Sequence, residues 1–147
     1  MDDLKRKAGA IWKGDSRTGD GSISTESRAL FEKPYTHKTR FNGGETTGTN
    51  PEELIAATHA ACFSMALAST LKKNGYDPKQ TDTTATCTLV PENGGYTIAA
   101  MDLHIRAEIP NIDKSKFQKM VMEADKNCPV SNLLRHGLKI EIDATLV

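Results

Sequence analysis

The sequence has no excess of charge of either sign, because its 19 basic side chains are balanced by 19 acidic ones. This balance removes any general electrostatic argument for binding nucleic acid or an anionic membrane surface. Long apolar runs are also missing: the longest, residues 60–68, is broken by Ser64, and a bilayer span needs about 20 residues. The N-terminus carries no apolar signal core. We therefore expect neither nucleic acid nor membrane as a partner.

Cysteine is scarce as well. Three cysteines are an odd number and too few for a secreted disulfide scaffold, so we expect a cytoplasmic protein with reduced thiols. No GxGxxG, Walker or GxSxG pattern is present, which removes support for nucleotide binding and for a serine hydrolase. His59 lies one helical turn before Cys62, but the remaining histidines are scattered singly. We expect no metal and no cofactor.

A length of 147 residues fits a single domain, residues 1–147, with a real core. The clearest element is a helix that Asn50 can cap, with Pro51 at its first position and Glu53 completing a capping-box-like pattern. Strong helix formers continue to Lys73, and Asn74-Gly75 supplies the stop. Apolar or small residues fall on almost every side of this helix, which predicts that it is buried.

The other patterns predict strands and two further helices. A second helix begins near Asp113 and ends at Cys128-Pro129, and Glu92-Asn93-Gly94-Gly95 is typical of a hairpin turn. Hairpins with two unequal helices between them indicate an α+β fold. The expected strands cover residues 8–12, 22–27, 35–41, 83–90, 97–108 and 139–147; a short helix covers residues 130–135, and Gly-rich loops cover residues 14–21 and 42–48.

Cys62 and Cys128 are the most informative residues. They are 66 positions apart, so they form neither a CxxC motif nor a zinc knuckle. Brought together, they would supply one thiol to attack and one to resolve, which is the minimum for reducing a peroxide without a bound cofactor. By position alone a structural role is the better explanation of each cysteine: Cys62 is a small buried apolar residue, Cys128 a helix breaker, and Cys87 a residue that fills a strand.

The thiols also differ in setting. Cys62 lies in mid-helix, where it has no help from the helix dipole, so a thiolate there needs a cation from elsewhere. Cys128 precedes Pro129 and can cap the short helix, where free N–H groups stabilise a negative sulfur.

Three segments, Thr49-Asn50-Pro51-Glu52-Glu53-Leu54, His59-Ala60-Ala61-Cys62-Phe63 and Cys128-Pro129-Val130-Ser131, resemble in this order the OsmC/Ohr family of thiol peroxidases. Residues 24–27, Tyr35 and residues 39–41 resemble the osmotically inducible OsmC branch. The resemblance covers essentially the whole chain. It implies an OsmC-like α+β fold, with antiparallel sheets, a long buried central helix and a second helix. It further implies an intertwined homodimer with two active sites at the subunit interface.

The resemblance also implies an activity, the reduction of organic hydroperoxides, and more weakly of hydrogen peroxide, in oxidative and osmotic stress defence. Cys62 is then the peroxidatic cysteine and Cys128 the resolving one, joined in a disulfide that a dithiol reduces, of the lipoyl type in the Ohr branch. Arg40, held by Glu52, would keep Cys62 ionised. Arg17 stands where the Ohr branch places its arginine and stays an alternative, as does Glu53, the better capping residue.

Two hypotheses complete the prediction. Glu52 and Cys62 are ten residues apart on one helix, roughly 15 Å, so one arginine can contact both only if the helix bends or a partner chain supplies the acid. The rival function is a non-catalytic dimer that senses redox state or holds a small apolar ligand. A pure binding protein would not need the complete set of Arg40, Glu52, Cys62 and Cys128.

Overall fold

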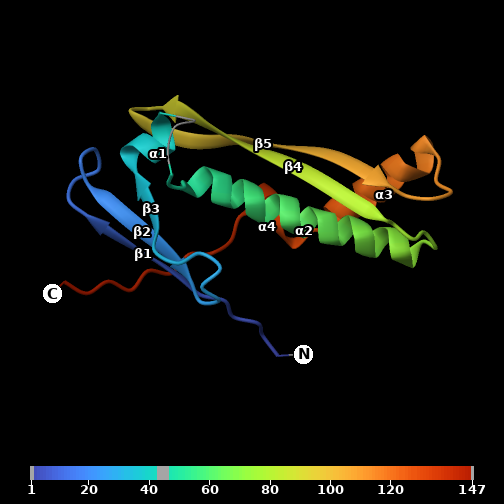
Figure 1. The fold of residues 1–147 in the computed structure, drawn as a ribbon, viewed down its shortest axis with the longest axis horizontal. Coiled ribbons are helices and arrows are strands. Elements are labelled where there is room, and N and C mark those ends of the chain that lie inside the picture. Colours follow the sequence, from blue (N-terminus) through green and yellow to red (C-terminus); the bar gives the residue numbers. More distant parts are fainter. Residues whose placement is uncertain (1, 43–46, 147) are drawn as a thin grey trace. The chain divides into compact units, whose positions relative to one another are not determined.

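The computed structural model describes residues 2–42 and 47–146. Its contacts divide the chain into two compact units, Met1–Ile55 and Ala56–Val147. Helices and antiparallel strands occur together along the chain (Figure 1). The expected α+β class is confirmed.

The first unit contains a three-stranded antiparallel sheet. Strands β1 (Ala8–Lys13), β2 (Asp20–Thr25) and β3 (Lys33–Thr36) lie in the order β1-β2-β3. Ala10 pairs with Ile23, and Ser22 pairs with Pro34 on the other side of β2. The first two predicted strands are therefore present, with bounds shifted by up to two residues.

The third predicted strand, residues 35–41, is wrong beyond Thr36. A short helix, α1 (His37–Phe41), takes its place. The reason is a capping box: the N–H of Thr39 donates to Thr36 Oγ1 at 3.1 Å, and the N–H of Thr36 donates to Thr39 Oγ1 at 2.8 Å. These bonds satisfy backbone donors at the helix start. Of the predicted loop at residues 42–48, residues 43–46 lie outside the described residues.

Helix α2 (Pro51–Lys73) follows the prediction closely. The N–H of Glu53 donates to Asn50 Oδ1 at 2.8 Å, which is the expected cap. At the other end Gly75 has a positive φ, and the N–H of Tyr76 returns to the carbonyl of Leu71 at 3.0 Å. By length and composition alone α2 could also cross a bilayer, a property that core helices of soluble proteins share.

The second unit contains a long antiparallel hairpin, β4 (Gln80–Glu92) and β5 (Gly95–Glu108), which runs beside α2 (Figure 1). Asn93 and Gly94, both with positive φ, form its two-residue turn as predicted. Ser64 Oγ on α2 donates to Thr83 Oγ1 on β4 at 2.8 Å, which joins the helix to the hairpin.

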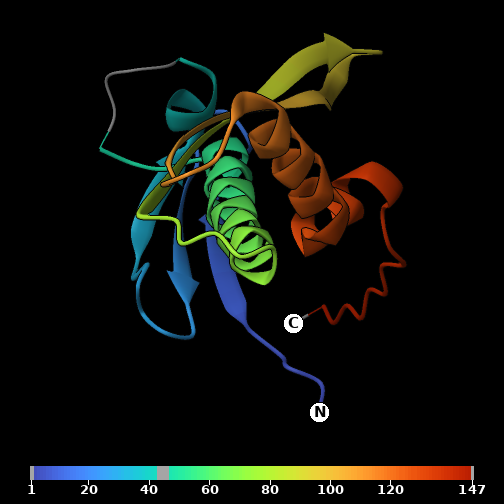
Figure 2. The ribbon, with the colours of Figure 1, turned by 90° about the vertical axis from the view of Figure 1, so that its right-hand side faces the viewer.

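Helices α3 (Lys114–Asn127) and α4 (Pro129–His136) complete the second unit. Asp113 caps α3 by accepting from the N–H of Lys116 at 2.9 Å. Figure 2 shows α3 beside α2, viewed along the latter. The core that forms between these elements consists of Phe63, Leu67, Leu71, Ala124 and Cys128.

The predicted final strand is wrong for residues 139–146, which have no strand pairing in the described part of the chain. Alternation of apolar and polar residues marks a segment that suits a sheet, but a strand also needs an edge to pair with. The apolar side chains of this tail are left in solvent, with Ile140 78% and Ile142 87% exposed.

Candidate functional site

The packing of the second unit brings Cys62 and Cys128 together. Cys62 lies on α2, and Cys128 is the residue between α3 and α4. The thiol of Cys62 hydrogen-bonds to the sulfur of Cys128, and no disulfide joins them. The fold therefore brings into contact two cysteines that are 66 residues apart in the sequence. Cys62 also packs against the core cluster to which Cys128 belongs.

Cys128 is the N-cap of α4, as its place before Pro129 predicts. Burial opposes ionisation of its thiol, but hydrogen bonds from the Ser131 hydroxyl, the Ser131 N–H, the Cys62 thiol and the Val130 N–H outweigh it and lower the Cys128 pKa. The Ser131 N–H lies 3.5 Å from Cys128 Sγ. The start of α4 therefore stabilises a negative sulfur.

Cys62 shows the opposite shift. Burial raises the pKa of its thiol, and a hydrogen bond from the Val130 N–H does not compensate. Within one chain, then, the surroundings favour ionisation of Cys128 and oppose that of Cys62, whereas the sequence led us to expect an ionised Cys62. Cys62 is nevertheless the more solvent-accessible of the two thiols, because Cys128 is fully buried while Cys62 is only half-buried.

Arg40 and Glu52 form an ion pair at the start of α2. Arg40 Nε donates to both carboxylate oxygens of Glu52, at 3.1 and 3.2 Å, and a terminal nitrogen of Arg40 lies 2.6 Å from Oε1. Glu53 instead accepts from the Thr49 hydroxyl at 2.5 Å. The acid that holds Arg40 is therefore Glu52, in the two-pronged geometry in which a guanidinium binds a carboxylate most tightly.

The neighbouring backbone orients this pair. Thr39 Oγ1 donates to the carbonyl of Thr49 at 2.8 Å, and Asn50 Nδ2 donates to the carbonyl of Thr39 at 3.3 Å. These contacts join α1, which carries Arg40, to the first turn of α2, which carries Glu52. Gly48 allows the close approach, because a Cβ there would lie 2.5 Å from the carbonyl oxygen of Pro34.

Arg17, the alternative arginine, lies in the turn between β1 and β2. Its N–H donates to Asp15 Oδ1 at 2.8 Å. The hydroxyl of Thr18 and the N–H groups of Thr18 and Arg17 lower the pKa of Asp15 to about 2. The turn is therefore organised around the Asp15 carboxylate, and the backbone of Arg17 is part of it.

A buried histidine–serine contact completes the site, and the sequence analysis missed it. His59 Nε2 lies 2.7 Å from Ser131 Oγ, and both residues are buried. Burial lowers the pKa of His59, with Asp125 opposing and Arg135 adding to this shift. His59 was considered only as a metal ligand, and within residues 2–42 and 47–146 no group of three or more possible metal ligands occurs. Its position one turn before Cys62 was the available signal.

Comparisons with known proteins identify the family of this chain. The family model described as OsmC-like protein matches residues 43–143. The chain belongs to the OsmC family. The Peroxiredoxin OsmC of Escherichia coli (strain K12) is 42% identical over 138 residues, which cover 94% of this chain and 95% of that protein.

Solved structures extend the OsmC family relationship to the fold. The organic hydroperoxide resistance protein OhrB of Bacillus subtilis is 26% identical, with a TM-score of 0.64 over 88% of this chain and 91% of that one. An organic hydroperoxide resistance protein from Elizabethkingia anophelis is 27% identical, with a TM-score of 0.67 over 92% of both chains. These relatives support a peroxidase-type role for this OsmC-family protein.

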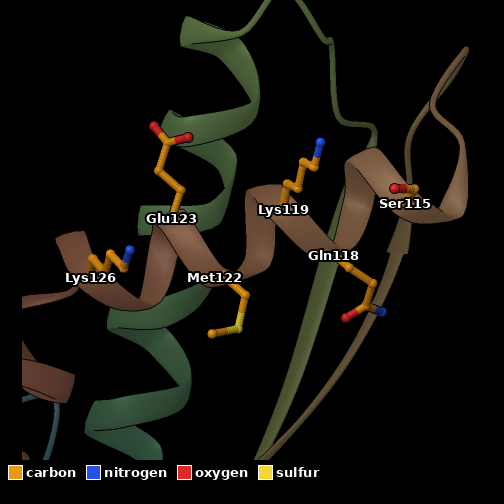
Figure 3. Close-up of a pocket in the computed structure, with 6 residues that line it drawn as sticks. All are labelled: Ser115, Gln118, Lys119, Met122, Glu123 and Lys126. Atoms are coloured by element: carbon orange, nitrogen blue, oxygen red, sulfur yellow. The ribbon is translucent and has the colours of Figure 1, made fainter.

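A separate hollow of about 660 Å³ lies on the outer side of α3, and Figure 3 shows the six side chains that line it. Polar and charged side chains dominate its lining, and none of the four predicted site residues belongs to it. The lining residues are Ser115, Gln118, Lys119, Met122, Glu123 and Lys126. The cysteine pair, and not this hollow, is therefore the candidate site of this OsmC-family chain.

Proposed function

We propose that this protein is a peroxiredoxin-like hydroperoxide reductase that converts organic hydroperoxides, and more weakly hydrogen peroxide, to alcohol or water in cytoplasmic stress defence. The observation that carries the proposal is the hydrogen bond between the Cys62 thiol and the sulfur of Cys128. The 42% identity to a protein named Peroxiredoxin OsmC supports the activity class. The relatives named organic hydroperoxide resistance proteins support the substrate class.

Cys62 is the attacking residue because it is the more accessible thiol of the pair. Its thiolate attacks the distal oxygen of the peroxide, so that an S–O bond forms and the O–O bond breaks. The alkoxide leaves and takes up a proton to become the alcohol. Cys62 is oxidised to a sulfenic acid, the first reversible rung of cysteine oxidation.

Cys128 resolves that intermediate. Its thiolate attacks the Cys62 sulfur, the S–S bond forms, and the S–O bond breaks with release of hydroxide, which solvent protonates to water. The lowered pKa of Cys128 suits this task, because a resolving thiol must be ionised near neutral pH to react. A dithiol reductant, of which a lipoyl-type compound is one candidate, then restores both thiols and is itself oxidised to a disulfide.

Arg40 is proposed to supply the cation that the peroxidatic thiolate needs. Within one chain burial raises the Cys62 pKa, so a positive group must approach the sulfur for it to ionise at neutral pH. Glu52 fixes the Arg40 guanidinium by hydrogen bonds at 2.6–3.2 Å. Ten residues of continuous helix, about 15 Å of rise, separate Glu52 from Cys62. We infer that the Arg40–Glu52 pair of one subunit serves Cys62 of a second subunit.

The required homodimer is supported by surface that one chain leaves uncovered. On α2 the side chain of Met65 is 76% exposed, although the helix is apolar on nearly every side. The tail at residues 138–146 alternates apolar and polar residues, and Leu146 is 99% exposed. A sequence suited to a strand and an uncovered apolar helix are both features that a second copy can bury.

The direct test is consumption of cumene hydroperoxide by the reduced protein with excess dithiol. The wild type and Cys87→Ser are expected to turn over repeatedly, because Cys87 lies in strand β4. Cys62→Ser is expected to lose activity. Peroxide loss no faster than with the dithiol alone, or equally fast with Cys62→Ser, would refute the proposal and favour the non-catalytic alternative.

A further inference from the structure

We propose that Ser131 and His59 form a hydrogen-bond relay that holds Cys128 as a thiolate and so sets the speed of disulfide formation. The proposal rests on the proposed function in one respect, the role of Cys128 as resolving thiol. Neither residue belongs to the predicted set of Arg40, Glu52, Cys62 and Cys128. Ser131 contacts the reacting sulfur, and His59 is a positioning residue that acts through Ser131.

The Ser131 hydroxyl contacts both the Cys128 sulfur and the His59 ring. Ser131 reaches Cys128 twice, through its N–H at 3.5 Å from Sγ and through its hydroxyl. The same hydroxyl oxygen lies 2.7 Å from His59 Nε2. A hydroxyl has one hydrogen to donate. When that hydrogen points at the Cys128 sulfur, the contact with His59 requires Nε2 to carry a proton and to donate it to Ser131.

The surroundings of His59 agree with this assignment. His59 is 5% exposed and Ser131 is 2% exposed, and Nδ1 of His59 has no hydrogen-bond partner among the described residues. A second proton on the ring would leave a buried N–H donor without an acceptor, which is costly. The charged groups that act on His59, Asp125 of α3 and Arg135 of α4, are paired with each other at 2.9 Å. His59 is therefore neutral, protonated at Nε2, and able to orient Ser131.

The consequence for the reaction concerns the second step alone. Donation from Ser131 stabilises the Cys128 thiolate before it attacks the Cys62 sulfenic acid, when the S–S bond forms and hydroxide leaves. Attack of the Cys62 thiolate on the peroxide needs neither Ser131 nor His59. Loss of the relay should therefore slow resolution and prolong the life of the sulfenic acid.

The first experiment uses no peroxide. In a Cys62→Ser, Cys87→Ser background Cys128 is the one remaining cysteine, and its thiolate is titrated by ultraviolet absorbance. Ser131→Ala and His59→Leu should raise the Cys128 midpoint. His59→Gln should retain it, because the glutamine amide can replace the Nε2 donor, and exposed Ser69→Ala should change nothing. Equal midpoints for His59→Gln and His59→Leu, or an unchanged midpoint in Ser131→Ala, would overturn the relay.

The second experiment follows resolution in the Cys87→Ser protein, with dimedone as competitor for the sulfenic acid and mass spectrometry as readout. Ser131→Ala and His59→Leu should slow disulfide formation roughly three- to tenfold per unit rise in the Cys128 pKa. The rate of sulfenic acid formation should not fall, because the hydrogen bond to Cys128 and its negative charge raise the pKa of Cys62, and neither contribution grows when the relay is lost. If the ratio of dimedone adduct to disulfide were the same in these variants as in the Cys87→Ser protein, the relay would be overturned. If no sulfenic acid forms in any variant, the proposed function fails instead, and the titration still decides the relay.

Discussion

Arg40 donates to both carboxylate oxygens of Glu52, twelve residues ahead in the chain, and both residues lie in the first unit. The Glu52 side chain is 11% exposed and that of Arg40 is 39% exposed. The acid is therefore largely removed from solvent while the base remains accessible. Such a pair can present a fixed positive charge to a third group.

Arg40→Met should both destabilise the protein and slow its peroxide reaction. It leaves the Glu52 carboxylate without its cation, a loss of about 1.5–3 kcal/mol for hydrogen bonds to a charged group, and it removes the charge proposed to ionise Cys62. Urea unfolding and the rate of the first thiol loss measure the two effects. Arg17→Met is the matched control and should be near neutral. If Arg40→Met left the rate of the first thiol loss unchanged while Arg17→Met lowered it, Arg17 would be the residue that ionises Cys62.

Mixing two inactive variants tests the shared site. A Glu52→Gln chain and a Cys62→Ser chain, unfolded and refolded together, should form heterodimers in which one of two sites keeps both groups. Random pairing of a twofold dimer then restores about a quarter of the wild-type activity. Each variant refolded alone should stay inactive. No recovery in a mixture shown to contain heterodimers would place Glu52 and Cys62 of the same chain in one site.

Gly48→Ala should disturb the Arg40 side of the site. The new Cβ would lie 2.5 Å from the Pro34 carbonyl oxygen and 2.7 Å from Thr39 Cγ2, which is closer than side chains tolerate. Overpacking of this kind costs about 1–3 kcal/mol, and the shift of Thr39 should reduce peroxide turnover. Gly9→Ala, with open space around its Cβ, is the control. Equal melting temperatures for the two variants would contradict the packing argument.

Stability should fall in mild acid partly through His59. Burial lowers the folded pKa of His59 below the unfolded value of about 6.5. Below that value the unfolded chain binds more protons, so the stabilisation present above about pH 6.5 is lost as the pH falls toward the folded pKa. His59→Gln should remove this part of the pH dependence, at most about 1.4 kcal/mol per pH unit. Exposed His104→Gln should leave it intact, as denaturant unfolding at several pH values will show.

Local patterns in the sequence predicted most of the elements. Asn50 before Pro51, Asn93-Gly94 between alternating runs, and Cys128 before Pro129 each specify a cap or turn through bonds to their nearest neighbours. The same locality explains the error at residues 37–41. The polar residues there favour a strand and a capped turn about equally. The reciprocal hydrogen bonds between Thr36 and Thr39 stabilise the start of a helix instead of a strand.

What depended on tertiary contact was harder to predict. The tail at residues 139–146 has the alternation of a strand, but pairing requires an edge that its own pattern cannot provide. The order of the thiol pKa values depends on burial at Cys62 and on the donors around Cys128. Ser131 and His59 are 72 residues apart, so their contact follows from the packing of α4 against α2 and from no local motif.

The most direct test of the account is the fate of the cysteines after one equivalent of cumene hydroperoxide is added to the reduced protein. Peptide mapping by mass spectrometry should show a Cys62–Cys128 disulfide, with two thiols lost and Cys87 unchanged. In Cys128→Ser the same treatment should leave a sulfenic acid on Cys62 that dimedone traps. A chain that keeps all three thiols, or one that forms its disulfide through Cys87, would contradict the account.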